Sequence, residues 1–172
     1  MNLQISYATA QDAQAVAQIH VDAWRAAYAG ILPPAYLASL SVPQREAMWR
    51  QVIDDRATDL LLARRDGVVQ GWLYFGPSRD AGVPTTEGEV MALYVAPASW
   101  SSGIGRQLWS RAKDAMVQQG YMTCSLWVFA QNAPAIKFCR ALGFAQSPVP
   151  MRDFDLGGQA CQEVRYACPI DR

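Results

Sequence analysis

Apolar and polar positions alternate over residues 3–7, which predicts a short β-strand at the start of the chain. Thr9 and Asp12 then have the spacing of a capping box, so we expect a helix to begin beside them. One face of this helix carries apolar residues at helical spacing: Val16, Ile19, Ala23 and Ala27. A neighbouring stripe carries rings four residues apart: His20, Trp24 and Tyr28. The pattern predicts a strand followed by an amphipathic helix with an aromatic edge.

The next stretch predicts a second helical region and a hairpin. A glycine and two prolines end the first helix, and a helical pattern interrupted near Pro43 spans residues 35–53. Residues 60–75 form two apolar runs joined by Asp66-Gly67, a dipeptide favoured in two-residue hairpin turns. These residues therefore predict two antiparallel strands.

A polar loop of residues 76–88 contains two prolines and is long for a hairpin connection, so it is a candidate functional loop. The elements expected after it are a strand at 89–95, a helix over 104–119, a strand at 125–129, a short helix capped by Asn132, and a closing hairpin over 149–168. Together the pattern predicts an α/β (α+β) fold, with a mixed, mostly antiparallel sheet of about seven strands flanked by helices.

Length and composition narrow the class of protein. The chain has 172 residues, 51% hydrophobic and 17% charged, as expected for a single domain spanning residues 1–172. Its 15 basic and 15 acidic residues cancel, so no whole-molecule field draws it to nucleic acid or a membrane surface. MNLQISYATAQD lacks a targeting pattern and no run approaches the ~20 apolar residues of a membrane span, which predicts a cytoplasmic protein. The four cysteines form no CxxC pair and there is one histidine, so no metal site is expected.

The segment SWSSGIGRQLW, Ser99 to Trp109, places two glycines between a predicted strand and a predicted helix. Such a turn can present backbone N–H groups and a helix N-terminus to a phosphate. A dinucleotide fingerprint needs a third glycine where this chain has Leu108, and a P-loop needs Gly-Lys-Ser/Thr, so both are excluded. A different anion site and a tight turn packed against the core both stay open.

Two segments together resemble the GCN5-related N-acetyltransferase (GNAT) family. EVMALYVAPASWSSGIGRQLWSRA is similar to the family's strand and its Arg/Gln-x-x-Gly-x-Gly/Ala pyrophosphate loop, and LWVFAQNAPAIKFCRALGF is similar to its later Asn-containing motif. HVDAWRAAYAGILPPAYLASL also resembles the N-terminal helices of one branch. The resemblance implies acetyl-CoA as cofactor and direct acetyl transfer to a primary amine of a small molecule, peptide or protein, without a covalent acyl-enzyme. It also implies a homodimer.

The resemblance further implies where the cofactor lies. The pantetheine arm would pair with the backbone of Leu93, Tyr94 and Val95 as an added strand. The pyrophosphate would lie on the following loop and first helical turn: Trp100, Ser101, Ser102, Gly103, Ile104, Gly105 and Arg106. Contacts with the cofactor arm would come from Asn132, Ala135 and Phe138. Asn132 is also expected to cap its helix, and that could be its whole role.

Two positions depart from the family pattern. Trp100 stands where Arg or Gln is usual, and Ser101-Ser102 replace residues that are commonly Gly and a basic residue. Because pyrophosphate binding depends mainly on backbone donors, we expect altered rather than lost binding. Cys139 stands where many members carry a tyrosine that protonates the CoA thiolate. Its thiol, with an ordinary pKa of ~8.5, is either that acid or a small packing residue, in which case Tyr94 or water would supply the proton.

The reaction also needs a base, because an amine is protonated at neutral pH and must lose a proton before it attacks. Glu89, at the head of its strand, is the first candidate, and Glu87 is the second. Either could instead be a solvated charge at a strand end. The developing oxyanion needs a backbone donor, for which the Val95 N–H or a neighbour is expected.

The acceptor is expected between the first helices and the 76–88 loop. Trp24 and Tyr28 would line its site and could hold an amine by cation–π contact, although a stripe at helical spacing is also typical of a core. His20, Trp49 and Arg25 are further candidates. The competing hypothesis is an acyl-CoA-binding module with weak or no activity, suggested by Trp100 and Cys139.

Overall fold

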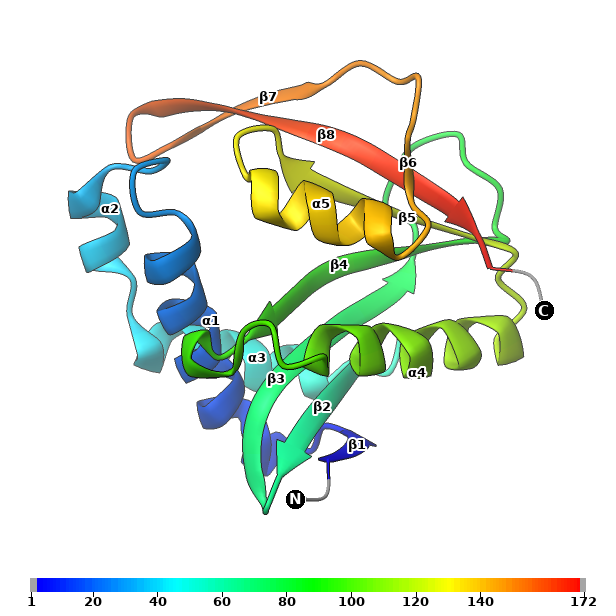
Figure 1. Ribbon diagram of the computed structural model, residues 1–172. Helices are drawn as coiled ribbons and strands as arrows, with labels where there is room; N and C mark the ends of the chain where they lie inside the picture. The colour runs from blue at the N-terminus through cyan, green and yellow to red at the C-terminus, as the bar shows by residue number, and fades with distance from the viewer. Residues whose placement is uncertain (1–2, 171–172) are drawn as a thin grey trace.

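The computed structural model describes residues 3–170, which form one sheet with helices on both faces (Figure 1). Its strands are β1 (Leu3–Tyr7), β2 (Asp59–Arg65), β3 (Val68–Pro77), β4 (Glu87–Val95), β5 (Thr123–Phe129), β6 (Ala145–Gln146), β7 (Arg152–Leu156) and β8 (Gln159–Pro169). Its helices are α1 (Ala13–Ala27), α2 (Pro34–Ser39), α3 (Val42–Asp54), α4 (Ile104–Gln118) and α5 (Ala133–Ala141), with 3-10 turns η1 (Ala10–Asp12) and η2 (Pro97–Ser99).

The sheet is mixed, as the hydrophobic pattern predicted. Its eight strands follow the order β1-β2-β3-β4-β5-β8-β6, and β7 pairs with β8. β4 and β5 are parallel, whereas the other described pairs are antiparallel. The strand beyond the expected seven or so is β6, whose two residues are too short to give a periodic signal. The predicted fold class is confirmed.

The N-terminal helices form where the sequence indicated. The Thr9 N–H donates to Asp12 Oδ2 at 2.8 Å, which makes the expected capping box. Arg64 of β2 forms an ion pair with Asp12 at 2.7 Å, so the same carboxylate joins the helix start to the sheet. The interrupted helical region is two helices, α2 and α3, and Pro43 lies in the first turn of α3, where proline is tolerated.

β4 and β5 diverge toward their carboxyl ends (Figure 1). They pair only where Glu87–Glu89 face Thr123–Ser125. β4 stays paired with β3 as far as Val95, but the register shifts so that Met91 is an extra residue on β4. A bulge bends its strand, so it helps β4 leave β5. We call the opening between residues 90–95 and the end of β5 the splay.

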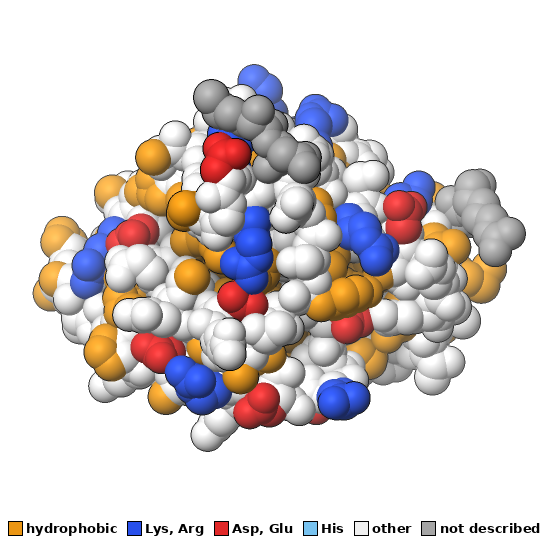
Figure 2. All heavy atoms as spheres, turned by 90° about the horizontal axis from the view of Figure 1, so that it is seen from below, with side chains coloured by type: hydrophobic (Ala, Val, Ile, Leu, Met, Phe, Trp, Pro, Cys, Tyr) orange, Lys and Arg blue, Asp and Glu red, His pale blue; other side chains and the backbone are white. Residues whose placement is uncertain are grey.

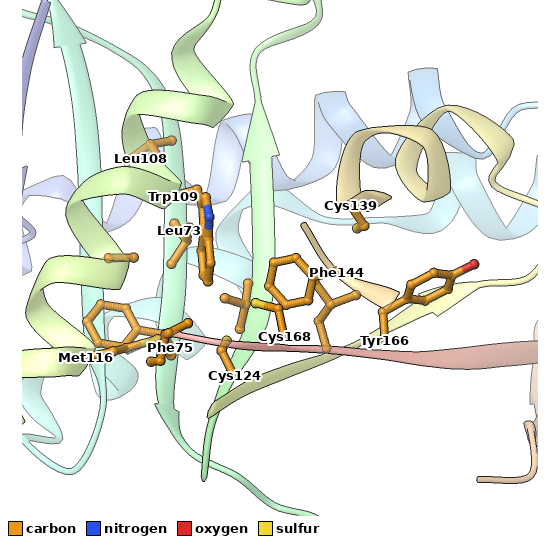
Figure 3. Close-up of a cluster of buried hydrophobic side chains, with 14 of the residues drawn as sticks. Leu73, Phe75, Leu108, Trp109, Met116, Cys124, Cys139, Phe144, Tyr166 and Cys168 are labelled. Atoms are coloured by element: carbon orange, nitrogen blue, oxygen red, sulfur yellow. The ribbon is translucent and has the colours of Figure 1, made fainter. Parts of the chain in front are cut away.

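Three hydrophobic clusters cover the two faces of the sheet. The first lies under α4 and α5, and Figure 3 shows part of it: Leu73, Phe75, Leu108, Trp109, Met116, Cys124, Cys139, Phe144, Tyr166 and Cys168. The second joins α1 and α3 to β2 and β3: Val16, Ile19, Trp49, Leu60, Leu62 and Trp72. The third joins α1 and α2 to β5 and β8: Val21, Tyr28, Leu32, Leu37, Leu40, Phe129 and Cys161. α1 therefore contacts both arms of the splay.

On the face seen in Figure 2, the described basic and acidic side chains are interspersed, and charges of one sign do not gather into a large patch. This agrees with the formal net charge of +0. Within residues 3–170, no helix is long and apolar enough to span a membrane. The connection between β3 and β4 covers residues 78–86, shorter than the expected 76–88 because both strands extend into it.

Candidate active site

The splay leaves one edge of β4 open. The Ala96 N–H donates to the Gln70 carbonyl at 2.8 Å, so these residues form a hydrogen-bonded pair between β4 and β3. Hydrogen-bonded and non-hydrogen-bonded pairs alternate along an antiparallel ladder. The peptide groups of Leu93 and Val95 therefore face away from β3, toward the splay. An extended ligand could add to this edge as a strand.

Trp100 reaches this edge from the loop before α4. Its indole Nε1–H donates to the Val95 carbonyl at 2.8 Å, although the residue is 46% exposed. The bond confirms the orientation inferred for Val95. The residue that departs from the family pattern thus contacts a backbone group expected to meet the pantetheine arm.

The N-terminus of α4 is suited to an anion. Gly103 occupies the N-cap position with φ of +83°, and its cap has neither a side-chain hydrogen bond nor an acidic residue in the first turn. The first N–H groups of a helix have no intrahelical partner, and the helix dipole favours negative charge there. Ser101 also has a positive φ, +60°, so the backbone turns sharply just before α4. Ser102 and Arg106 are exposed beside it.

Glycine is favoured at the two positions of this turn for different physical reasons. No atom lies within 4 Å of a Cβ built on Gly103, so its left-handed φ is what favours glycine. A Cβ on Gly105 would lie 2.9 Å from the Phe138 ring, so Gly105 allows α4 to approach α5. Gly105 therefore fits the tight-turn interpretation, and the anion site at Gly103 stays a prediction.

Asn132 is a helix cap, as expected. Its side-chain oxygen accepts a hydrogen bond from the Ala135 N–H at 3.2 Å, and the residue is 9% exposed. It also lies close enough to Tyr28 to influence that phenol. Its contact with a cofactor stays a prediction.

Glu89 lies where β4 and β5 separate, but Arg79 covers it. Oε2 accepts hydrogen bonds from the Arg79 backbone N–H at 2.9 Å and from Nε at 3.1 Å, and Oε1 accepts one from a terminal nitrogen at 2.6 Å. Glu89 is 1% exposed, whereas the Arg79 side chain is 61% exposed. Glu89 is thus the third residue of β4 and is buried, not a solvated charge at a strand end, and both of its oxygens are engaged; its role as base stays a prediction.

Glu87 belongs to a second buried ion-pair cluster. Its carboxylate accepts from the Ser125 hydroxyl at 3.0 Å and pairs closely with Arg165. Arg165 also donates to Asp80 at 2.8 Å, and Arg152 pairs with the same Asp80. Burial alone would raise the pKa of Asp80, but its hydrogen bonds from Arg165 and Trp127 lower it overall.

Aromatic rings join the two arms of the splay on the α1 side. Tyr28 packs against Trp24 at 4.9 Å and against Phe129 of β5 at 4.6 Å between ring centroids. Trp24 also lies 6.5 Å from Tyr94 of β4. Burial raises the pKa of Tyr28 and of Tyr94, so both phenols keep their protons at neutral pH. The predicted acceptor residues Trp24 and Tyr28 therefore meet Tyr94 here.

The other acceptor candidates in the first helices support this row of aromatic rings and do not line the proposed acceptor site. His20 stacks on Tyr94 at 5.6 Å, and its Nδ1 accepts a hydrogen bond from Trp49 Nε1 at 3.0 Å. Burial lowers the pKa of His20 to about 4, so it is neutral. Arg25 Nε donates to the Leu37 carbonyl at 3.1 Å, which fixes α2.

Cys139 lies in the main hydrophobic cluster beside Phe144 and Tyr166 (Figure 3) and is 7% exposed. Burial raises the pKa of its thiol to about 11. This environment is the one expected for a packing residue.

The sequence interpretation missed several side chains that lie around the splay, among them Arg79, Asp80, Phe129 and Arg165. The first two lie in the candidate functional loop, so that loop was the available signal. Phe129 and Arg165 read as strand residues, and only the pairing of β5 with β8 brings them to the site. In the described part of the chain, no three His, Cys, Asp or Glu side chains gather as a metal site would require.

Comparisons with known proteins agree with this geometry. The acetyltransferase (GNAT) family matches residues 14–144. The chain is 30% identical over 161 residues to the uncharacterized N-acetyltransferase YuaI of Bacillus subtilis (strain 168), covering 92% of this chain and 88% of that protein. It is 23% identical over 159 residues to spermidine N(1)-acetyltransferase of Thermoplasma acidophilum, covering 90% and 95%.

The structure of YncA from Salmonella typhimurium with acetyl-CoA superposes with a TM-score of 0.76 at 23% identity, covering 100% of this chain and 96% of that one. At this identity the likeness concerns the fold. The family match, in contrast, includes the diverging strands, the turn before α4 and the Asn132 cap. The chain belongs to the acetyltransferase (GNAT) family.

Proposed function

We propose that this acetyl-CoA-dependent N-acetyltransferase acts on a primary amine that is cationic in solution, carried by a small molecule or a peptide. One observation carries the proposal. The splay has an open backbone edge and an uncapped helix N-terminus on one side, and carboxylates with aromatic rings on the other. A ligand with an extended polar arm and a diphosphate fits the first side, and an ammonium group fits the second.

Acetyl-CoA would use mostly backbone groups. Its pantetheine arm would pair with Leu93 and Val95, and its pyrophosphate would lie on the N–H groups from Ser101 to Arg106, with Trp100 and the serine hydroxyls beside them. Arg106 would add positive charge. The thioester supplies the activated acetyl group, and a splay-facing N–H of Leu93 or Val95 would stabilise the oxyanion that develops on it.

The acceptor would enter against Trp24 and Tyr28. This region holds four carboxylates and three arginines: Asp80, Glu87, Glu89 and Glu163, with Arg79, Arg152 and Arg165. The excess of negative charge among these described side chains favours a cationic acceptor. The spermidine acetyltransferase among its relatives acts on such an amine. A small polyamine is the first acceptor to test. A homodimer and a cytoplasmic location stay predictions.

Cys139 would pack rather than act as the acid. Its thiol is buried in the main hydrophobic cluster beside Phe144 and Tyr166, an environment typical of a packing residue, and Tyr94 or water would protonate the CoA thiolate instead. Cys139→Ala should therefore keep near-wild-type turnover and acetyl-CoA affinity while lowering thermal stability. Loss of turnover with unchanged affinity would assign the acid to Cys139.

Release of free CoA thiol should be measured with a polyamine, an amino acid and a peptide with a free N-terminus, beside acetyl-CoA affinity by calorimetry. We expect turnover with the polyamine to exceed turnover with the amino acid. Tight acetyl-CoA binding without turnover on any amine would instead support an acyl-CoA-binding module.

A further inference from the structure

Glu163 differs from the other carboxylates around the splay. Glu89 pairs with Arg79, Glu87 pairs with Arg165, and Asp80 pairs with two arginines. Within residues 3–170, the Glu163 carboxylate takes part in no hydrogen bond or ion pair. It is only partly exposed, so solvent does not fully compensate its charge.

The register of β8 places Glu163 on the acceptor side of the sheet. It lies directly opposite Phe129 on β5, and directly opposite residues share a face. Phe129 contacts Tyr28, which contacts Trp24. Glu163 thus stands at the β8 end of the aromatic row that leads to Tyr94.

Arg152, the neighbour of Glu163 on β7, is engaged elsewhere. Although the two residues are paired in register, the Arg152 guanidinium binds Asp80 and stacks 3.7 Å from the centroid of Trp127. Glu163 therefore keeps an unpartnered carboxylate beside the rings.

The groups that surround Glu163 agree with this placement. Burial raises its pKa, Arg152 and Arg79 oppose the shift, and Glu89 adds to it. Tyr28 and Tyr94, whose pKa values burial raises, are shifted further by the Glu163 charge. The Glu163 charge therefore acts on groups at the end of α1, on β4 and in the β3–β4 connection.

We propose that Glu163, rather than Glu89, is the carboxylate that receives the proton of the acceptor ammonium, an inference that rests on the proposed N-acetyltransferase function. Glu89 is the poorer candidate because it is 1% exposed and Arg79 occupies both of its oxygens. Glu89 acts instead as a positioning residue that fixes Arg79 and the β3–β4 connection.

The proton balance closes with no further reactant. One ammonium proton passes to Glu163 and then to solvent, and the neutral amine nitrogen forms a bond to the acetyl carbon. The C–S bond breaks with its electron pair on sulfur, and a second proton of the nitrogen goes to the CoA thiolate. The ammonium and acetyl-CoA become the acetamide, CoA thiol and one free proton.

The test compares kcat/KM against pH, over about pH 5 to 9, for the full chain and for Glu163→Gln, Glu163→Asp, Glu89→Gln and Asp153→Asn. We expect Glu163→Gln to lose about 10²–10³-fold in kcat/KM and to lose the acid limb, with acetyl-CoA affinity by calorimetry unchanged. Glu163→Asp should restore part of the rate. Asp153→Asn removes an acid from the opposite face of the same hairpin and should change neither quantity.

A second readout does not depend on turnover. In protein with ¹³C-labelled glutamate carboxyls, the signal that disappears in Glu163→Gln should titrate above the usual range of glutamate. Wild-type kcat/KM and an intact acid limb in Glu163→Gln, or loss of that limb in Glu89→Gln alone, would overturn the role of Glu163. If the wild-type protein turns over no amine, the proposed function itself fails and takes this role with it.

Discussion

On the side of the splay proposed for the cofactor (the cofactor side), the groups available to a ligand belong to the main chain of Leu93, Val95 and the first turn of α4. On the acceptor side they are side chains held by other side chains, as Arg79 holds Glu89 and Arg165 holds Glu87. A main-chain site depends on the course of the backbone and accepts changes of side chain. A buried network of charges depends on every partner, because each one removed leaves another uncompensated.

The difference predicts which departures from the family pattern the chain tolerates. Trp100, Ser101 and Ser102 change side chains at the cofactor side, and the open edge and uncapped helix remain. The acceptor side contains arginines that none of the family motifs in the sequence predicts. Under the proposed function, specificity for an amine would reside where motifs give the least information.

The largest effect is expected from Arg165→Met. The Arg165 side chain is 9% exposed and binds Asp80, Glu87 and Ser147, so its loss leaves the buried Glu87 without a cationic partner and Asp80 with Arg152 alone. The free energy of unfolding should fall by about 3–5 kcal/mol in urea denaturation. Arg152→Met, which removes a 45% exposed partner of the same Asp80, should cost about 1 kcal/mol or less. Equal losses would show that the cluster is no more buried than an ordinary surface network.

His20 makes the acceptor side sensitive to acid. Its pKa is about 4 in the folded protein and about 6.5 when unfolded, so the unfolded chain binds more protons between these values. The contribution of neutral His20 to the free energy of unfolding is fully present above pH ~6.5 and falls by about 3 kcal/mol as the pH drops toward 4. Denaturation at several pH values should show this loss, and His20→Gln should flatten it. Because His20 is the chain's one histidine, its NMR titration reports the site directly. A pKa near 6.5 in the folded protein would contradict the buried placement.

On the cofactor side, Gly103→Asp should weaken acetyl-CoA binding about 10–100-fold, because a carboxylate would stand where the helix N-terminus awaits a diphosphate. No atom lies within 4 Å of the new Cβ, but the left-handed φ of +83° strains any side chain, so the free energy of unfolding should fall by about 1 kcal/mol. Gly103→Asn is the matched control, because asparagine tolerates the same φ without the charge. Equal affinities for all three proteins would place the pyrophosphate elsewhere.

The sequence predicted the elements whose signals are local. The capping box at Thr9, the Asn132 cap and the turn at Asp66-Gly67 all depend on residues a few positions apart, and all are present. The two-residue β6 escaped because it exists only by pairing with β8.

The site was predictable in its backbone part and not in its charges. The Gly103 turn is contiguous, whereas the Glu87–Arg165 pair joins residues 78 positions apart and forms only because β5 pairs with both β4 and β8. Cys139 was singled out from a family position, and only its burial favoured packing over acid chemistry. Long-range pairing decides such cases, and periodicity carries no signal for it.

Trp100→Phe should have the smallest effect and the most informative sign. In the free protein the indole N–H holds the Val95 carbonyl, and a phenyl ring keeps the apolar surface but not the donor. An extended ligand arm would then find that carbonyl free, so acetyl-CoA affinity by calorimetry should rise about fivefold, the equivalent of one hydrogen bond of about 1 kcal/mol.

Ser99→Ala is the control for Trp100→Phe, because it removes the 2.6 Å hydrogen bond from Ser99 to Gln70 in the same loop and leaves Val95 untouched. Its affinity for acetyl-CoA should match the wild type. Weaker binding by Trp100→Phe would show that the indole contributes to the cofactor site instead of competing for it. In that case cofactor binding would depend on the Trp100 side chain. The contrast between the main-chain site and the side-chain site would then not hold at this residue.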